Sequence, residues 1–138
     1  MKFPFKRRLA RGRTHGRKRE MNRTERRYAA ELSAQMLAGE IIQWWREPFS
    51  MRLTDTDGLT TWTPDFMVLY PDGTLEMVDV KGSMGWESAQ RAKIKVAADR
   101  YFPFRFVGMQ EVAKKHGGGW KREVFAWSDE TETAKENA

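Results

Sequence analysis

Three residues near the middle of the chain have side chains that could do chemistry together. Asp65 and Asp79 are carboxylates, and Lys81 follows Asp79 by two residues. Because side chains alternate between the two faces of a β-strand, Asp79 and Lys81 are expected to point to the same face. Two carboxylates held close in a partly buried place repel unless a cation lies between them. Oxygen ligands of this kind suit a hard divalent ion, so the spacing predicts a Mg²⁺ site with a lysine beside it.

A β-hairpin is the element expected to bring these side chains together. Strand-like residues run from 66 to 70 and from 75 to 78, and Pro-Asp-Gly-Thr at 71–74 is typical of a turn. A hairpin folds the chain back, so Asp65 should lie alongside Asp79 and Lys81. Two other interpretations stay open. Asp65 follows a proline and could simply close a turn, and Asp79 with Lys81 could be a solvent-facing pair on an edge strand.

The order of these residues resembles the PD-(D/E)XK nuclease superfamily: Pro64-Asp65, a hairpin, then Asp79-Val80-Lys81. Residues 22 to 107 also resemble a small phage-encoded branch of that superfamily. The matching motifs are Asn-Arg-Thr-Glu at 22–25, Trp-Thr-Pro-Asp-Phe at 62–66, Val-Lys-Gly at 80–82 and Lys-Ile-Lys at 93–95. The chain departs from the branch at Asp79, where Glu is usual, and the shorter side chain reduces the reach of this ligand.

The resemblance implies a fold, an activity and a set of site residues. The fold would be α/β (α+β), a central mixed β-sheet flanked by helices with a restriction-endonuclease-like αβββαβ core. The activity would be hydrolytic cleavage of DNA, with Glu25, Asp65, Asp79 and Lys81 as catalytic residues. Mg²⁺, or Mn²⁺ in its place, would be held by Asp65, Asp79, Glu25 and the backbone carbonyl of Val80. Small members with a basic arm include Holliday junction resolvases, which implies branched DNA as substrate and a homodimer as the active form.

Glu25 has a second expected role, at the start of a helix. Asn22 is a good N-cap, and Glu25 three residues later completes a capping box. Tyr28 and Leu32 follow at helical spacing, and Gly39 is expected to end the helix. The capping box alone would explain Glu25, yet its position on the face of Tyr28 and Leu32 starts the stripe that packs on the sheet. Both roles stay open.

The other elements are expected from periodicity and turn residues. Together they predict one domain at residues 21–127, a sheet with helices packed on it. The further segments are strands at 41–45, 49–53, 104–109 and 120–127, and a helix at 87–100 with Ile94, Ala98 and Tyr101 on one stripe.

Basic charge is concentrated at the N-terminus. Residues 1–20 hold nine Lys or Arg and one acid, a net charge of +8, while the rest hold sixteen bases and eighteen acids, a net charge of −2. Such a segment does not fold alone and neutralises phosphates without reading sequence, although a solubilising leader has the same composition. We expect a disordered nucleic-acid-binding arm at 1–20 and an acidic disordered tail at 128–138. The expected nucleic-acid contacts are Lys6, Arg7, Arg8, Arg11, Arg13, Arg17, Lys18 and Arg19 in the arm, and Arg91, Lys93 and Lys95 on the second helix.

Composition also excludes several classes. The chain has no cysteine, so disulfides, thiolate zinc sites and cysteine catalysis are excluded. No apolar run approaches the roughly 18 residues of a membrane span, and no apolar segment follows the basic N-terminus. We therefore expect no membrane partner and a cytoplasmic protein, in the host cell if phage-encoded. Three alternatives stay open: a nuclease with another target (restriction-like, nicking or repair), a non-catalytic nucleic-acid-binding protein, and a scaffold or assembly protein.

Overall fold

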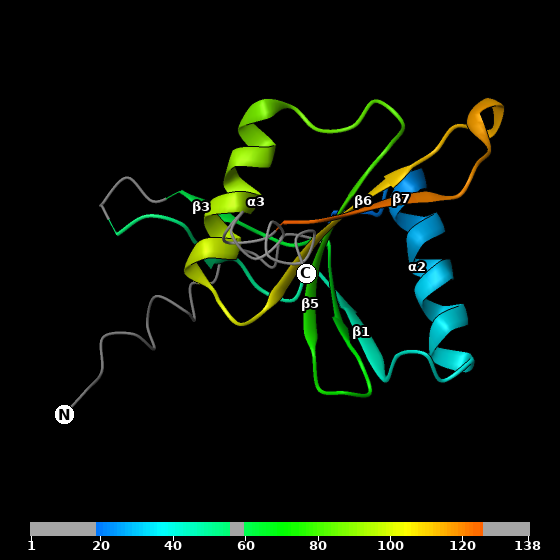
Figure 1. Ribbon diagram of the computed structural model, residues 1–138, viewed down its shortest axis with the longest axis horizontal. Coiled ribbons are helices and arrows are strands. Elements are labelled where there is room, and N and C mark those ends of the chain that lie inside the picture. Colours follow the sequence, from blue (N-terminus) through cyan, green and yellow to red (C-terminus); the bar gives the residue numbers. More distant parts are fainter. Residues whose placement is uncertain (1–18, 56–59, 126–138) are drawn as a thin grey trace, which may run out of the picture.

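A computed structural model describes residues 19–55 and 60–125 of the chain. Its centre is a mixed sheet of five strands (Figure 1). Strands β5 and β6 are parallel, and each of the other neighbouring pairs is antiparallel. The predicted α+β class with a central mixed sheet is confirmed. In spatial order the strands are β1 (Gln43–Arg46), β4 (Phe66–Leu69), β5 (Leu75–Lys81), β6 (Arg105–Glu111) and β7 (Trp120–Val124).

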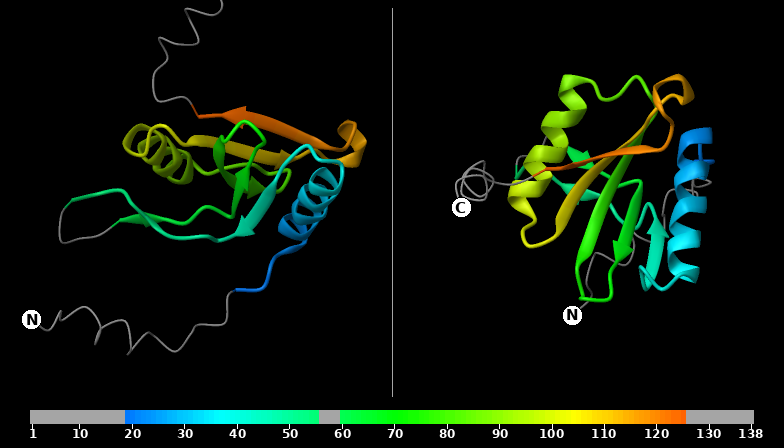
Figure 2. Two further views of the ribbon diagram at one scale, coloured as in Figure 1. Left: turned by 90° about the horizontal axis from the view of Figure 1, so that it is seen from below. Right: turned by 45° about the vertical axis from the view of Figure 1, so that its right-hand side comes forward.

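Two α-helices cover the two faces of this sheet (Figure 2). Helix α2 (Arg23–Leu37) lies on one face and helix α3 (Ser88–Arg100) on the other, and both begin within one residue of their predicted starts. The 3-10 helix η1 (Lys114–His116) lies in the connection between β6 and β7. No helix in the described part of the chain is long and apolar enough to cross a membrane.

Each face of the sheet has its own apolar cluster. Val78 and Val80 of β5 pack with the residues of α2, whereas Met77 packs with those of α3. This alternation is the predicted one, and it assigns Asp79 and Lys81 to the α3 face of the sheet. The buried residues of the α2 cluster include Tyr28, Leu32, Phe66 and Val68, and those of the α3 cluster include Trp62, Ile94, Ala97, Ala98 and Phe106.

The strand predicted at 49–53 does not join the main sheet. Its ordered part, β2 (Met51–Arg52), instead pairs with β3 (Thr61–Trp62) in a two-stranded ribbon. The segment is extended, as predicted, but its pairing with β3 was not foreseen. The ribbon packs against the α3 face of the sheet, because Met51, Leu53 and Trp62 bury their side chains in the α3 cluster. Residues 1–18, 56–59 and 126–138 lie outside the described residues, and these include most of the predicted arm, the predicted tail and residues 126 and 127 of the predicted domain.

The two local motifs near the site form as predicted. Asn22 Oδ1 accepts a hydrogen bond from Glu25 N at 2.9 Å, and Glu25 Oε2 accepts one from Asn22 N at 3.1 Å, which is the capping box. The hairpin of β4 and β5 pairs Phe66 with Val78, so Asp65 enters the sheet beside Asp79. The turn is closed by Asp72, whose carboxylate accepts from Thr74 N at 2.9 Å.

Candidate active site

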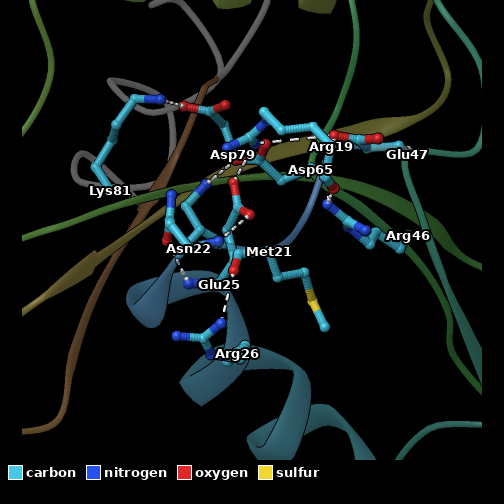
Figure 3. A network of polar contacts seen from close by, with 11 residues as sticks. Arg19, Met21, Asn22, Glu25, Arg26, Arg46, Glu47, Asp65, Asp79 and Lys81 are labelled. Carbon is cyan, nitrogen blue, oxygen red and sulfur yellow. Dashed lines mark hydrogen bonds and ion pairs between the residues drawn. The ribbon is translucent and has the colours of Figure 1, made fainter. Parts of the chain in front are cut away.

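The two carboxylates and the lysine that the sequence singled out meet at the C-terminal end of β5 (Figure 3). Asp65 Oδ2 accepts a hydrogen bond from the backbone N–H of Val80 at 2.7 Å. Lys81 Nζ lies 3.1 Å from Asp79 Oδ2. Asp79 is only 5% exposed, which does not fit a solvent-facing pair. The hairpin register therefore places Asp65, Asp79 and Lys81 in one cluster, the predicted arrangement.

The electrostatics of Asp65 show that the positive charge of Lys81 does not offset both carboxylates. Burial and the neighbouring Asp79 carboxylate raise the pKa of Asp65 to about 7, against the opposing effects of the Val80 N–H and the Lys81 ammonium. Since the ordinary value is near 3.9, the folded chain disfavours two negative charges here at neutral pH. A further cation between the carboxylates would allow both to ionise.

Asp79 is held in place by Trp86, a contact that the sequence did not predict. The indole Nε1 donates to Asp79 Oδ2 at 2.6 Å from the loop that follows β5. The ring lies against Gly108, which pairs with Asp79 across β5 and β6. A Cβ atom at Gly108 would lie 2.7 Å from the Trp86 ring, so only glycine leaves room for this indole. A single tryptophan in a loop carries no pattern that would have revealed this.

A pocket of about 210 Å³ opens beside the cluster, on the α3 face of the sheet. Asp79 and Lys81 line it from β5, and Lys93 lines it from α3; the nucleic-acid contact expected of Lys93 stays a prediction. The remaining lining residues are Thr61, Trp62, Thr63, Gln90 and Ile94. The pocket thus joins a carboxylate and two ammonium groups around a space that an anion could enter.

The other two basic residues predicted on α3 lie elsewhere. Arg91 Nη1 donates to Glu123 Oε2 of β7 at 2.9 Å, and the guanidinium lies 5.4 Å from the Phe125 ring centroid. Lys95 is exposed and does not line this pocket. Of the three predicted phosphate contacts on this helix, the geometry favours Lys93.

Glu25 is buried, but its partner is an arginine. Arg19 Nη2 lies 2.6 Å from Glu25 Oε1 and 3.8 Å from Glu47 Oε1. The pKa of Arg19 is raised, mainly by its hydrogen bond and charge interaction with Glu25, and further by Glu47 and Asp65. Figure 3 shows Arg19 lying among these acids. Because α2 packs on the face opposite Asp79, Glu25 contacts Arg19 rather than joining the carboxylates of the hairpin.

The residues present fit a metal held by two carboxylates. Within residues 19–55 and 60–125, no group of three or more His, Cys, Asp or Glu side chains lies together. Mg²⁺, however, is commonly bound through one or two carboxylates and keeps several waters. Asp65 and Asp79 meet that requirement, and the Val80 carbonyl follows directly. A ligand role for Glu25 stays a prediction, whereas its capping role is confirmed.

Of the predicted arm contacts, Arg19 is the one within the described residues. Its backbone carbonyl accepts a hydrogen bond from the Arg46 guanidinium of β1, which fixes the end of the arm beside the site. Lys6, Arg7, Arg8, Arg11, Arg13, Arg17 and Lys18 lie outside the described residues. Their role in binding nucleic acid stays a prediction.

A second buried polar cluster lies at the opposite end of β5. Glu76 is fully buried and accepts hydrogen bonds from Tyr70 Oη at 3.0 Å, Arg105 Nε at 2.6 Å and Arg122 Nη2 at 2.7 Å. The cluster satisfies the carboxylate fully, and it ties β4, β5, β6 and β7 together. Its geometry is that of a structural ion network rather than a reactive site.

Comparison with protein-family models, with curated proteins and with solved structures gives no match. The function of the chain therefore has to be argued from the residues of the site.

Proposed function

We propose that this protein is a metal-dependent endonuclease of the PD-(D/E)XK type that hydrolyses phosphodiester bonds in DNA. The observation that carries the proposal is the meeting of Asp65, Asp79 and Lys81 at the end of β5, beside a pocket that Lys93 also lines. A buried pair of carboxylates that a cation would stabilise, next to the ammonium groups of Lys81 and Lys93, suits the charge of a phosphodiester and its metal.

The order of elements supports the same proposal. Along the chain, α2, β1, β4, β5, α3 and β6 follow one another as helix, three strands, helix and strand, with the β2–β3 ribbon inserted after β1. The resemblance implies an αβββαβ core, and this order, with the ribbon set apart, supports that assignment. The same order also places the Asp65 and Asp79 strands next to each other and α3 over the pocket.

Each residue of the site has a role in the proposed reaction. Asp65 and Asp79 would hold Mg²⁺ with the Val80 carbonyl, and the bound ion supplies a Lewis acid that offsets charge on the reacting phosphate. Lys81, a quarter exposed, is placed to orient the attacking water or to stabilise the developing negative charge. Lys93 would bind a phosphate oxygen from the other side of the pocket.

Branched DNA such as a Holliday junction is the substrate that we propose, in phage DNA metabolism. Two lines of argument support it: the resemblance to small junction-cleaving enzymes, and the concentration of +8 in residues 1–20, which attracts DNA without regard to sequence. Symmetric cutting of a junction needs two active sites, so the active form would be a homodimer acting in the cytoplasm of the host.

A non-catalytic nucleic-acid-binding protein is the second candidate, and one observation favours it. Arg19 lies against Glu25 and near Asp65, where its guanidinium supplies positive charge that a metal would otherwise bring. In such a protein the acids would serve to anchor the arm, and the arm would provide the affinity.

Incubation of the full chain with a four-way junction, a linear duplex and a single strand distinguishes the two candidates. The proposal predicts cleavage in Mg²⁺, with the junction cut fastest, and none in EDTA. Binding without cleavage in Mg²⁺ or Mn²⁺ would favour the second candidate. The matched control is Lys95→Ala, which removes an exposed ammonium on the same helix as Lys93 and should leave cleavage unchanged, whereas Lys93→Ala should slow it.

A further inference from the structure

A second and larger hollow lies on the far side of Lys81 from the pocket. This hollow, which we name the hairpin cleft, has a volume of about 820 Å³. It is bounded by the first half of α2, the loop after β5 and the tip of the β6–β7 hairpin, which converge in the upper right of Figure 1. Gly82 and Ser83 line it. They directly follow Lys81, so the hairpin cleft adjoins the candidate active site.

The walls of the hairpin cleft carry net positive charge. Arg27 forms an ion pair with Glu111 across its floor. Arg23 and Lys114 also line the cleft, and among the described residues neither has an acidic partner. Two uncompensated cations therefore face the same space from opposite sides, one on α2 and one on η1. This arrangement favours a polyanion over a neutral or cationic ligand.

The cleft also offers an aromatic ring and a stretch of bare backbone. Trp120 lines it and is only partly buried, with its ring 5.3 Å from that of Tyr28 at 70°. Gly118 and Gly119 have φ of +69° and +77°, so this part of the wall has no side chains and allows close approach. Cations that contact successive phosphates, together with an aromatic ring that is accessible on one side, are features of grooves that bind single-stranded nucleic acid.

We infer that the hairpin cleft binds the sugar–phosphate backbone of the nucleic-acid strand that flanks the scissile phosphate. A phosphate held between Lys81 and Lys93 would be followed by nucleotides that pass over Gly82 and Ser83 into the cleft. There Arg23 and Lys114 contact successive phosphates. The link to cleavage rests on the proposed function, whereas the binding of nucleic acid in the cleft does not.

The salt dependence of binding tests this inference without using cleavage. The full chain is titrated with a fluorescent single-stranded oligonucleotide in EDTA at several salt concentrations. Arg23→Gln and Lys114→Gln should each flatten the slope of log K against log salt by about 0.7, and the double variant by about 1.4. Lys121→Gln is the matched control. Lys121 does not line the cleft, and its side chain lies on the opposite face of β7 from Trp120. Its slope should equal that of the parent chain.

A cysteine footprint gives an independent readout, since the chain has no cysteine of its own. Bound oligonucleotide should slow maleimide modification of the Ser83→Cys variant in proportion to the fraction of protein bound. It should leave the Ala30→Cys variant, on an exposed position of α2 outside the cleft, unchanged. Slopes equal to that of Lys121→Gln, or equal modification rates with and without oligonucleotide, would overturn the inference.

The failure of this inference and that of the proposed function are distinguishable. Flattened slopes and a footprint in a chain that cuts no DNA would support nucleic-acid binding in the hairpin cleft and refute the nuclease activity. Metal-dependent cleavage with unchanged slopes would support the nuclease activity and refute nucleic-acid binding in the hairpin cleft.

Discussion

Asp65→Asn should make the metal-free protein more stable at pH 8, although it removes a residue of the proposed active site. In the folded chain, burial and Asp79 raise the pKa of Asp65 to about 7, whereas the unfolded value is near 3.9. The folded state therefore binds the Asp65 proton more tightly than the unfolded state does. Between about pH 4 and pH 7 the free energy of unfolding must fall as pH rises, and above pH 7 the loss is complete.

The size of this loss follows from the same shift. About three pKa units at 1.36 kcal/mol each give an upper limit of roughly 4 kcal/mol. Asparagine has no charge to bury, and its carbonyl oxygen can still accept the 2.7 Å hydrogen bond from Val80 N. We therefore expect Asp65→Asn to gain about 2 to 4 kcal/mol over the parent chain at pH 8, and little or nothing at pH 4.

Urea unfolding of both chains in EDTA, from pH 4 to pH 8, measures this difference. The control is Asp72→Asn, an exposed aspartate whose pKa is lowered by its hydrogen bonds with Thr74, so its removal should bring no gain as pH rises. Added Mg²⁺ should stabilise the parent chain at pH 8 and have little effect on Asp65→Asn. Parallel stability curves for the parent and Asp65→Asn would refute the argument that the two carboxylates strain the metal-free site.

Substitutions at three further residues separate chemistry from structure. Lys81→Ala should remove most cleavage while the chain stays folded. Lys81→Arg should not restore cleavage fully, because the guanidinium has a different shape and keeps its proton. Normal turnover of Lys81→Ala with a lowered melting temperature would instead indicate a structural ion pair. Glu25→Gln retains a capping side chain but loses the charge. A folded and inactive Glu25→Gln variant would assign Glu25 to catalysis. Normal activity of Glu25→Gln, together with a loss of about 1 kcal/mol of stability in Glu25→Ala, would assign Glu25 to the cap alone. Glu76→Gln should cost about 3 kcal/mol or more in urea unfolding, because it leaves the Arg105 and Arg122 guanidinium groups facing a neutral amide; a loss below 1 kcal/mol would contradict the structural role of that network.

The parts of the fold that the sequence predicted are set by local patterns. The capping box of Asn22 and Glu25 spans three residues, and the hairpin is defined by its turn and by apolar runs on both sides. Both depend on neighbours in the chain, so the register that joins Asp65 to Asp79 could be inferred. Lys93 was expected to contact nucleic acid, which stays a prediction, and α3 places it among the residues that line the pocket.

The contacts that the sequence did not reveal join side chains whose spacing fits no helix or strand pattern. Trp86 reaches Asp79 only because β6 pairs in parallel with β5 and places Gly108 under the indole. Arg91 was expected to face phosphate, yet β7 brings Glu123 within its reach. Arg19 was expected to act with the rest of the arm, whereas it is held by Glu25. The partner of Arg91 is set by sheet order, and those of Trp86 and Arg19 by the path of the chain before and after a helix or strand, which residue spacing does not encode.

If Asp65 and Asp79 form a metal-dependent site that cuts DNA, the cleavage rate of Asp79→Asn is the most direct measure of it. Single-turnover cleavage of a four-way junction in Mg²⁺ would be measured for the parent chain and for Asp79→Asn, with binding of the same junction measured in EDTA. We expect the parent chain to cleave the junction and Asp79→Asn not to cleave it. Asp79→Asn should bind the junction equally or more tightly, because one negative charge near the phosphate is gone. Cleavage by Asp79→Asn at the parental rate would contradict a metal-dependent site at Asp65 and Asp79.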